Sequence, residues 1–152
     1  MKLIHGDCLE VLPTFAAGSM DLVVTSPPYN LGISYKTFKD TAPREDYLVW
    51  CRTWAAEVKR VMADDASFFL NVGAAPANPL MPHQLLLALT DGAEPLFTLQ
   101  NTFHWIKSIT IETTKGEQVS AGHFKPINSK RFVNDCHEYI FPLTRSGNVE
   151  LD

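Results

Sequence analysis

The sequence predicts an α/β protein built on an open sheet with crossover helices. Short apolar, β-branched runs such as 21–25 and 67–72 are typical of strands, and the segment between them has helical periodicity. Alternation of strand and helix along the chain is the pattern of an open α/β sheet. The 152 residues suffice for one domain, and 45% apolar with 20% charged residues is the balance of an ordinary globular protein.

The predicted elements follow the order strand, strand, helix, strand, helix, strand, strand. Their ranges are 3–5, 21–25, 44–62, 67–72, 83–89, 96–106 (one long strand or two) and 138–143, with a short helix at 8–15 and loops at 30–40, 74–82 and 113–131. The continuous apolar run of 21–25 suits a strand buried on both faces of a parallel sheet. It ends at Ser26 because the prolines that follow cannot donate to a strand ladder.

Composition excludes several kinds of site. The three cysteines lie far apart without a CxxC pair, which excludes a disulfide framework and disfavours zinc. The five histidines are scattered, so we predict no metal. No apolar run approaches the roughly 18 residues of a membrane span, and Met1–Gly6 carries no signal-peptide stretch. We therefore expect a cytoplasmic protein without a membrane partner.

Charge is unevenly distributed along the chain. The net charge is −4, yet the segment 104–134 holds five basic residues against two acidic ones. A basic segment on an acidic body is compatible with phosphate contact, although the charge alone is better explained by a solvated loop with a few lysines. The basic residues Lys125, Lys130 and Arg131 lie between Phe124 and Phe132, and this mixture of basic and aromatic residues suits a loop that contacts DNA.

Two turns follow consecutive predicted strands, Gly6-Asp7-Cys8 and Ser26-Pro27-Pro28-Tyr29. Ligands gather at the carboxyl ends of strands in open α/β sheets, so the two turns could share one rim. The second turn suits the methylation of an exocyclic base amine, whose lone pair is delocalised into the ring. The Ser26 hydroxyl and the Pro27 carbonyl could accept hydrogen bonds from both N–H groups and draw the nitrogen towards tetrahedral geometry. Proline fixes φ and stiffens the turn, and Tyr29 offers a face on which a flipped base could stack.

The same residues resemble a known family. Asp21–Asn30 resembles the catalytic motif of amino-methylating DNA methyltransferases, (Asp/Asn/Ser)-Pro-Pro-(Tyr/Phe/Trp), and Gly6–Leu12 is similar to the segment that contributes to their S-adenosylmethionine pocket. The resemblance implies a partial Rossmann-like methyltransferase sheet with S-adenosylmethionine as cofactor. It implies that Ser26, Pro27, Pro28 and Tyr29 are catalytic, that Asp7 and Cys8 contact the cofactor, and that Asn30, Lys125, Lys130 and Arg131 contact DNA.

The resemblance also implies double-stranded DNA as substrate and allows a homodimer and a cognate restriction endonuclease as partners. Serine at the first motif position favours cytosine N4 over adenine N6. Methylation at cytosine C5 needs a cysteine nucleophile, which follows a proline in the signature of the C5 enzymes. None of the cysteines here follows a proline, so C5 methylation is disfavoured. The family's Phe-x-Gly-x-Gly cofactor loop is absent, which predicts that residues 1–152 are the N-terminal part of one catalytic domain, inactive alone. An inactive nucleic-acid-binding fragment and an RNA or protein amide methyltransferase are the alternatives.

Several further residues are interpreted more simply. Trp50 and Trp54 fall at helical spacing and suit packing better than base stacking. Lys107, at the end of a predicted strand, suits an ordinary surface lysine better than a phosphate contact. His137-Glu138 could shape the base pocket or form a structural hydrogen-bonded pair.

Overall fold

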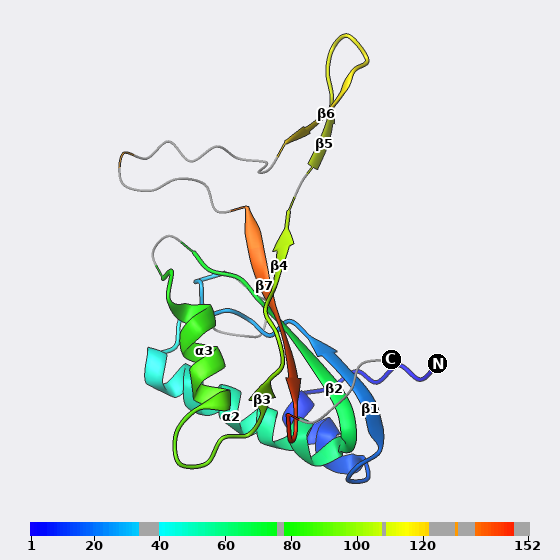
Figure 1. Ribbon diagram of the computed structural model, residues 1–152, viewed down its shortest axis with the longest axis vertical. Helices are drawn as coiled ribbons and strands as arrows, with labels where there is room; N and C mark the ends of the chain where they lie inside the picture. Colours follow the sequence, from blue (N-terminus) through cyan, green and yellow to red (C-terminus); the bar gives the residue numbers. More distant parts are fainter. Residues whose placement is uncertain (34–39, 76–77, 108, 122–129, 131–135, 148–152) are drawn as a thin grey trace.

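A computed structural model describes residues 1–33, 40–75, 78–107, 109–121, 130 and 136–147. Along the chain these residues form α1 (Cys8–Val11), the 3₁₀ helix η1 (Leu12–Thr14), β1 (Met20–Thr25), α2 (Arg44–Val61), β2 (Met62–Val72), α3 (Met81–Thr90), β3 (Thr98–Leu99), β4 (Phe103–Ile106), β5 (Ile109–Glu112), β6 (Gln118–Ala121) and β7 (His137–Thr144). Figure 1 shows helices beside one mixed sheet and a separate hairpin extending from it.

The main sheet has the order β1-β2-β7-β3, with β4 also paired to β7. Strands β1 and β2 are parallel and are joined by α2 as a crossover helix, as the predicted fold class requires. Strand β7 runs antiparallel to β2, and both β3 and β4 run antiparallel to β7. The predicted segment 96–106 is thus two short strands, which share β7 as their partner.

Helix α2 confirms the prediction for 44–62 almost to the residue. Its buried side chains recur at three- and four-residue steps and face the even-numbered side chains of β2. The core also takes in α3, Phe97 and β7. Its fully or nearly fully buried members include Cys51, Ala55, Phe68, Leu70, Leu85, Leu89, Phe141 and Leu143. Trp54 is 4% exposed and meets Phe68 edge to face, so the packing interpretation of this tryptophan is correct.

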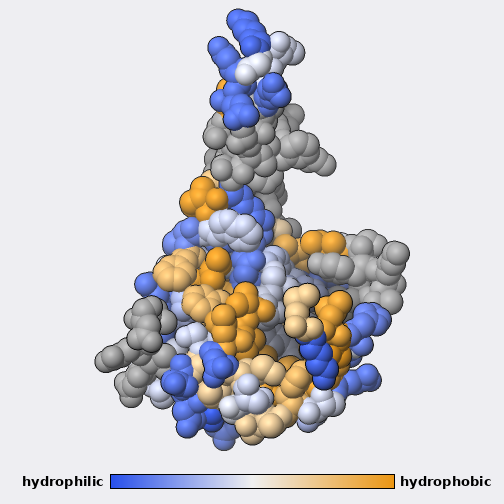
Figure 2. Space-filling model, turned by 90° about the vertical axis from the view of Figure 1, so that its right-hand side faces the viewer, coloured by the Kyte–Doolittle hydropathy of each residue, from blue (hydrophilic) through white to orange (hydrophobic). Residues whose placement is uncertain are grey.

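Two predictions for the first strands are wrong: that residues 3–5 form a strand, and that the strand at 21–25 is buried on both faces. Residues 3–5 form no strand, because no described strand lies beside them to pair, and Leu3 is 91% exposed. Strand β1 pairs only with β2 among the described residues, and helices cover one of its faces. Leu22 and Val24 point to the other face, where they are 58% and 68% exposed. Figure 2, which looks onto the side of the molecule that holds β1, shows apolar surface there.

The prediction of a loop over 113–131 is wrong for its first part. Strand β6 pairs with β5 in a two-stranded antiparallel hairpin that extends away from the helices (Figure 1). Thr113 and Glu117 close the turn by a backbone hydrogen bond of 2.8 Å, and Gly116 adopts a φ of 77° that favours glycine. Most of the remaining loop, 122–129 with Lys125, and 131–135 with Arg131, lies outside the described residues.

Candidate active site

Four strand ends converge on one rim of the sheet. The parallel strands β1 and β2 both end there, at Thr25 and Val72. Strand β7 begins at this rim because it is antiparallel to β2, with Val72 opposite Tyr139. Strand β4 ends there for the same reason, with Trp105 opposite Glu138. The Ser-Pro-Pro-Tyr turn therefore meets residues of three other strands at the place where open α/β sheets bind ligands.

The Tyr29 hydroxyl connects the motif to these strands. Its oxygen lies 2.5 Å from the Ser26 Oγ, 3.3 Å from the Asn71 Oδ1 and 3.5 Å from the Glu138 Oε2. The Asn71 side chain is oriented by β7, since its Nδ2 donates to the Tyr139 carbonyl at 3.1 Å. The amide oxygen of Asn71 consequently faces Tyr29 as an acceptor.

The direction of the Ser26–Tyr29 hydrogen bond follows from these partners. An amide oxygen and a carboxylate can only accept, so the single Tyr29 proton points towards Asn71 and Glu138. The Tyr29 oxygen then accepts the proton of Ser26. A hydroxyl has two lone pairs besides its proton, and we infer that those of the exposed Ser26 hydroxyl are directed outward as acceptors.

Tyr47 of α2 fixes the diproline turn through a hydrogen bond. Its hydroxyl donates to the Pro28 carbonyl at 2.7 Å, and the residue is 2% exposed. Burial raises the pKa of the Tyr47 phenol far above its usual value, with smaller contributions from Cys51 and Asp40. The phenol therefore stays protonated and acts as a permanent donor, which fixes the Pro28 carbonyl.

The loop after Tyr29 is organised by Asp40, which is 2% exposed. The carboxylate accepts backbone N–H groups from Asn30 at 2.8 Å and from Leu31 and Ile33 at 3.0 Å. Asn30 has a φ of 57°, and both polar atoms of its side chain bond to the backbone of Ala42 at 2.9 Å. In this structure the Asn30 side chain thus holds the loop, and its contact with DNA stays a prediction.

Lys107 and Glu138 form an ion pair between the end of β4 and the start of β7. The Glu138 side chain is 14% exposed and that of Lys107 47% exposed. The backbone of Gly73 lies against this pair, since a Cβ there would be 3.1 Å from Tyr29 Cε2 and 3.2 Å from Glu138 Oε1. A side chain at position 73 would therefore press on both residues. Lys107 is thus a half-exposed lysine directly after the end of β4, as expected, and it is paired with Glu138.

A pocket of about 400 Å³ brings the predicted cofactor and catalytic residues together. Cys8 lines it on one side and Ser26, Pro27 and Pro28 on another. The remaining lining residues are mostly apolar: Leu12, Val23, Val24, Thr25, Trp50, Trp54 and Val58. Asp7 stands at the start of α1, where its Oδ1 accepts the Leu9 N–H at 2.8 Å as an N-cap. Partial burial and the Asp7 carboxylate raise the pKa of the Cys8 thiol.

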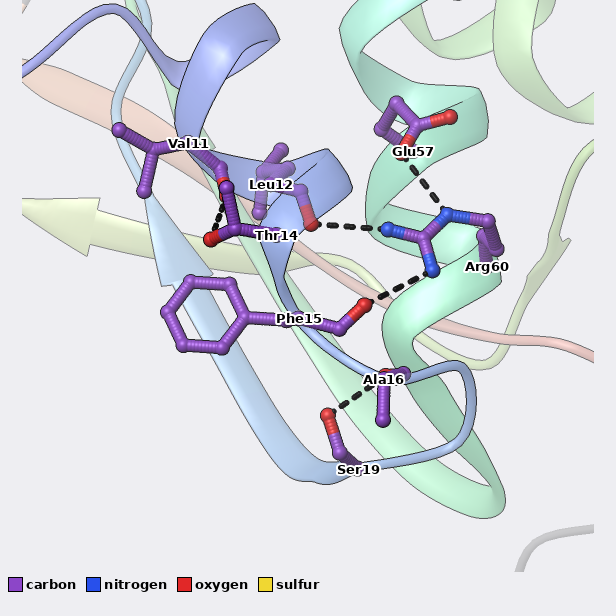
Figure 3. Close-up of polar contacts among 8 residues, drawn as sticks. All are labelled: Val11, Leu12, Thr14, Phe15, Ala16, Ser19, Glu57 and Arg60. Atoms are coloured by element: carbon purple, nitrogen blue, oxygen red, sulfur yellow. Dashed lines mark hydrogen bonds and ion pairs between the residues drawn. The ribbon is translucent and has the colours of Figure 1, made fainter.

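Arg60 of α2 fixes the segment that carries Asp7 and Cys8 (Figure 3). Its guanidinium donates to the carbonyls of Leu12 at 2.8 Å and Phe15 at 3.0 Å, and it pairs with Glu57 at 2.8 Å. One arginine thereby satisfies two carbonyls around the end of η1 and joins this segment to α2. The position of the cofactor-contact candidates relative to β1 depends on this clamp.

The predicted DNA contacts are placed only in part. Lys130 is exposed, whereas Lys125 and Arg131 lie outside the described residues. Within the described part of the chain, no three His, Cys, Asp or Glu side chains gather as a metal site would need. No helix among these residues is long and apolar enough to cross a membrane.

Sequence reasoning missed the residues that support the motif. Asp40 stood in a segment interpreted only as a polar loop, and Tyr47 was not distinguished from other helix residues. Asn71 was only one residue of a predicted strand, and Glu138 was considered only together with His137. The one available signal was topological, since Asn71 and Glu138 lie at the ends of predicted strands.

Comparisons with known proteins agree with this architecture. A family model described as DNA methylase, of the N6/N4 type, matches residues 20–150. The type II methyltransferase M.ScaI of Streptomyces caespitosus is 34% identical, over 97% of this chain and 46% of that protein. The structure of the PvuII DNA methyltransferase (cytosine-N4-specific) superposes with a TM-score of 0.71 at 23% identity, over 97% of this chain and 50% of that one.

A second solved structure is TTHA0409 of Thermus thermophilus, a DNA modification methylase complexed with S-adenosyl-L-methionine. Its TM-score is 0.57 at 22% identity, over 97% of this chain and 54% of that one. The chain thus spans about half the length of these relatives. It belongs to the N6/N4 DNA methylase family, and its fold is the α/β fold of S-adenosylmethionine-dependent methyltransferases.

Proposed function

We propose that this member of the N6/N4 DNA methylase family provides the amine-binding half of an active site that methylates an exocyclic base amine in DNA. The observation that carries the proposal is the contact of 2.5 Å between the Ser26 and Tyr29 hydroxyl oxygens at the rim of the sheet, in which we infer that Ser26 is the donor. Its lone pairs can accept one N–H of the target amine, and the adjacent Pro27 carbonyl can accept the other. Tyr47 and the diproline preorganise this pair of acceptors.

The remaining motif residue, Tyr29, has two roles in this proposal. Its hydroxyl is engaged with Ser26 and Asn71, which fixes the plane of the ring. A flipped base can then stack on a ring that is already ordered, so little side-chain entropy is lost on binding. Most of the rate gain would come from positioning the amine against the methyl donor.

The pocket beside the motif fits part of S-adenosylmethionine. Its largely apolar lining, with Trp50 and Cys8, suits an adenine ring, whereas the charged methionine end needs polar partners outside this lining. Cys8 and Asp7, the N-cap residue of α1, would hold the cofactor, which supplies an activated methyl group. The absence of a Phe-x-Gly-x-Gly loop leads us to expect that residues 1–152 alone bind the cofactor weakly and are inactive.

We further propose cytosine N4 as the target in preference to adenine N6. Serine at position 26 supports this choice, and the name of the structurally similar PvuII enzyme, cytosine-N4-specific, is consistent with it. Double-stranded DNA would be contacted by Asn30, Lys125, Lys130 and Arg131. A homodimer, a cognate restriction endonuclease and a cytoplasmic location stay predictions.

The test is Ser26→Ala in the complete gene product. We expect methyl transfer to DNA to fall by about 100-fold or more, the usual effect of losing one preorganised polar group, with cofactor affinity unchanged. Survival of activity would show that Ser26 is not an amine acceptor. Nucleoside mass spectrometry of the methylated DNA identifies the base, and N6-methyladenine as product would contradict the preference for cytosine.

Cofactor titration separates the enzyme from an inactive nucleic-acid-binding fragment. If the complete gene product binds DNA but neither S-adenosylmethionine nor its demethylated product, the binding fragment is the better account. An RNA or protein amide methyltransferase predicts instead that DNA is no substrate while RNA or a glutamine-containing peptide is.

A further inference from the structure

We propose that Glu138 is the proton acceptor at the end of a relay that runs from the target amine through Ser26 and Tyr29. This inference rests on the proposed function and assigns a role to residues outside the Ser-Pro-Pro-Tyr motif. Two of these residues, Ser26 and Tyr29, lie in the turn after β1, and Glu138 lies in β7. The contact between Tyr29 and Glu138 joins residues that are 109 positions apart in the sequence.

The distances fit such a relay. The Ser26 and Tyr29 oxygens are 2.5 Å apart, and with Ser26 assigned as the donor the Tyr29 proton is left for Asn71 and Glu138. Of these two acceptors, only a carboxylate is basic enough to take a proton. The Tyr29–Glu138 distance of 3.5 Å has to shorten for transfer, as hydrogen bonds of free active sites commonly do when substrate binds.

Proton transfer would accompany methylation, so loss of the acceptor slows methyl transfer itself. As the new N–C bond forms and the donor's methyl–sulfur bond breaks, the amine gains one positive charge and keeps an N–H bond directed at Ser26. That N–H proton passes to the Ser26 oxygen as the Ser26 proton passes to the Tyr29 oxygen and the Tyr29 proton to Glu138 Oε2. The base is left as a neutral methylamine and Glu138 as a neutral carboxylic acid, so charge and protons balance.

Lys107 prepares and resets the acceptor in this scheme. Its ammonium group pairs with Glu138 Oε1 and leaves Oε2, the oxygen that faces Tyr29, as the proton acceptor. The Lys107 side chain is 47% exposed, which gives Glu138 a polar route to solvent for releasing the proton. Gly73 leaves the room that Tyr29 and Glu138 need to approach each other.

The first experiment compares Glu138→Gln with Glu94→Gln in the complete gene product. Glu94 is an exposed residue, so its variant matches the chemical change without touching the relay. We expect Glu138→Gln to lower the single-turnover rate of methyl transfer by about 100-fold, as loss of a general base does, with the affinities for DNA and cofactor within twofold of the original. An unchanged rate, or a loss confined to binding, overturns the relay.

The second experiment is a double-mutant cycle with Tyr29→Phe. Phenylalanine keeps the stacking ring and removes the hydroxyl that links Ser26 to Glu138. If all three groups form one path, Tyr29→Phe combined with Glu138→Gln is no slower than the slower single variant. Multiplicative losses would show that the two residues act independently and would refute the relay.

The third experiment does not depend on catalysis. In ¹³C NMR spectra of the chain, Tyr29→Phe should shift the carboxyl resonance of Glu138, because the variant removes a hydrogen-bond donor from that group. An unmoved resonance overturns the relay whatever the activity. Conversely, a gene product that transfers no methyl group to DNA, yet shows the shift, contradicts the proposed function and leaves the Tyr29–Glu138 contact standing.

Discussion

Replacing Asp40 by asparagine should destabilise the protein by an amount that the structure allows to be worked out. One carboxylate oxygen accepts the Asn30 N–H, and the other accepts those of Leu31 and Ile33. Asparagine keeps the shape but turns one oxygen into an NH₂ donor. The better orientation keeps the two bonds to Leu31 and Ile33 and sets the new NH₂ against the Asn30 N–H.

The energetic cost then has two parts. One charge-assisted hydrogen bond is lost, at about 1.5–3 kcal/mol, and two others become neutral and lose roughly half their strength. The two parts sum to a loss of about 3–6 kcal/mol in the free energy of unfolding, which is a large share of the roughly 5–15 kcal/mol typical of a domain. At about 2–4 °C per kcal/mol for a chain of this size, the Tm should fall by roughly 6–24 °C.

Urea and thermal unfolding of the chain measure this loss. Asp65→Asn is the matched control, since Asp65 is exposed on β2, and its effect should stay within about 0.5 kcal/mol. Equal stabilities of the two variants would refute the view that Asp40 organises the loop after Tyr29. A large effect of both variants would point to net charge instead.

Three further changes test the parts of the site. Arg60→Met removes the hydrogen bond to the Leu12 carbonyl, so protease cleavage before β1 should increase and the affinity for the cofactor should fall several-fold. Unchanged cleavage would show that Arg60 does not fix this segment. Because the pKa of Cys8 is raised, less thiolate is present at pH 8 than in a free cysteine, so alkylation of Cys8 should be slow at pH 8 and accelerate above pH 9. S-adenosylmethionine should protect Cys8 from alkylation in the complete gene product. A lack of protection would contradict the assignment of this pocket to the cofactor. Gly73→Ala should cost about 1–3 kcal/mol of stability and lower methyl transfer without changing cofactor affinity, because the new Cβ meets Tyr29; full activity would show that this contact is unimportant.

Local patterns predicted the core elements well. Helix α2 and strands β2 and β7 follow from periodicity and β-branched runs, which depend on residues a few positions apart. The errors arose where the outcome depends on a distant partner. Residues 3–5 have strand composition, but none of the described strands pairs with them. Leu22 and Val24 have buried-strand composition, yet they are exposed on a face that the described helices leave open. The strands β5 and β6 do alternate apolar and polar residues, but each run has only four residues, and their pairing depends on the turn between them.

The same distinction applies within the candidate site. The motif was recognised because its four residues are contiguous, and its chemistry was assigned to Ser26 and to the ring of Tyr29. The state of the Ser26 hydroxyl depends, however, on partners of Tyr29 that lie 42 and 109 positions away. A serine hydroxyl without such partners could as well point its own proton at the incoming amine, where it would repel the N–H groups. The acceptor role that we propose for Ser26 is therefore a property of the sheet topology, which brings β2 and β7 to the same rim, as much as of the motif itself.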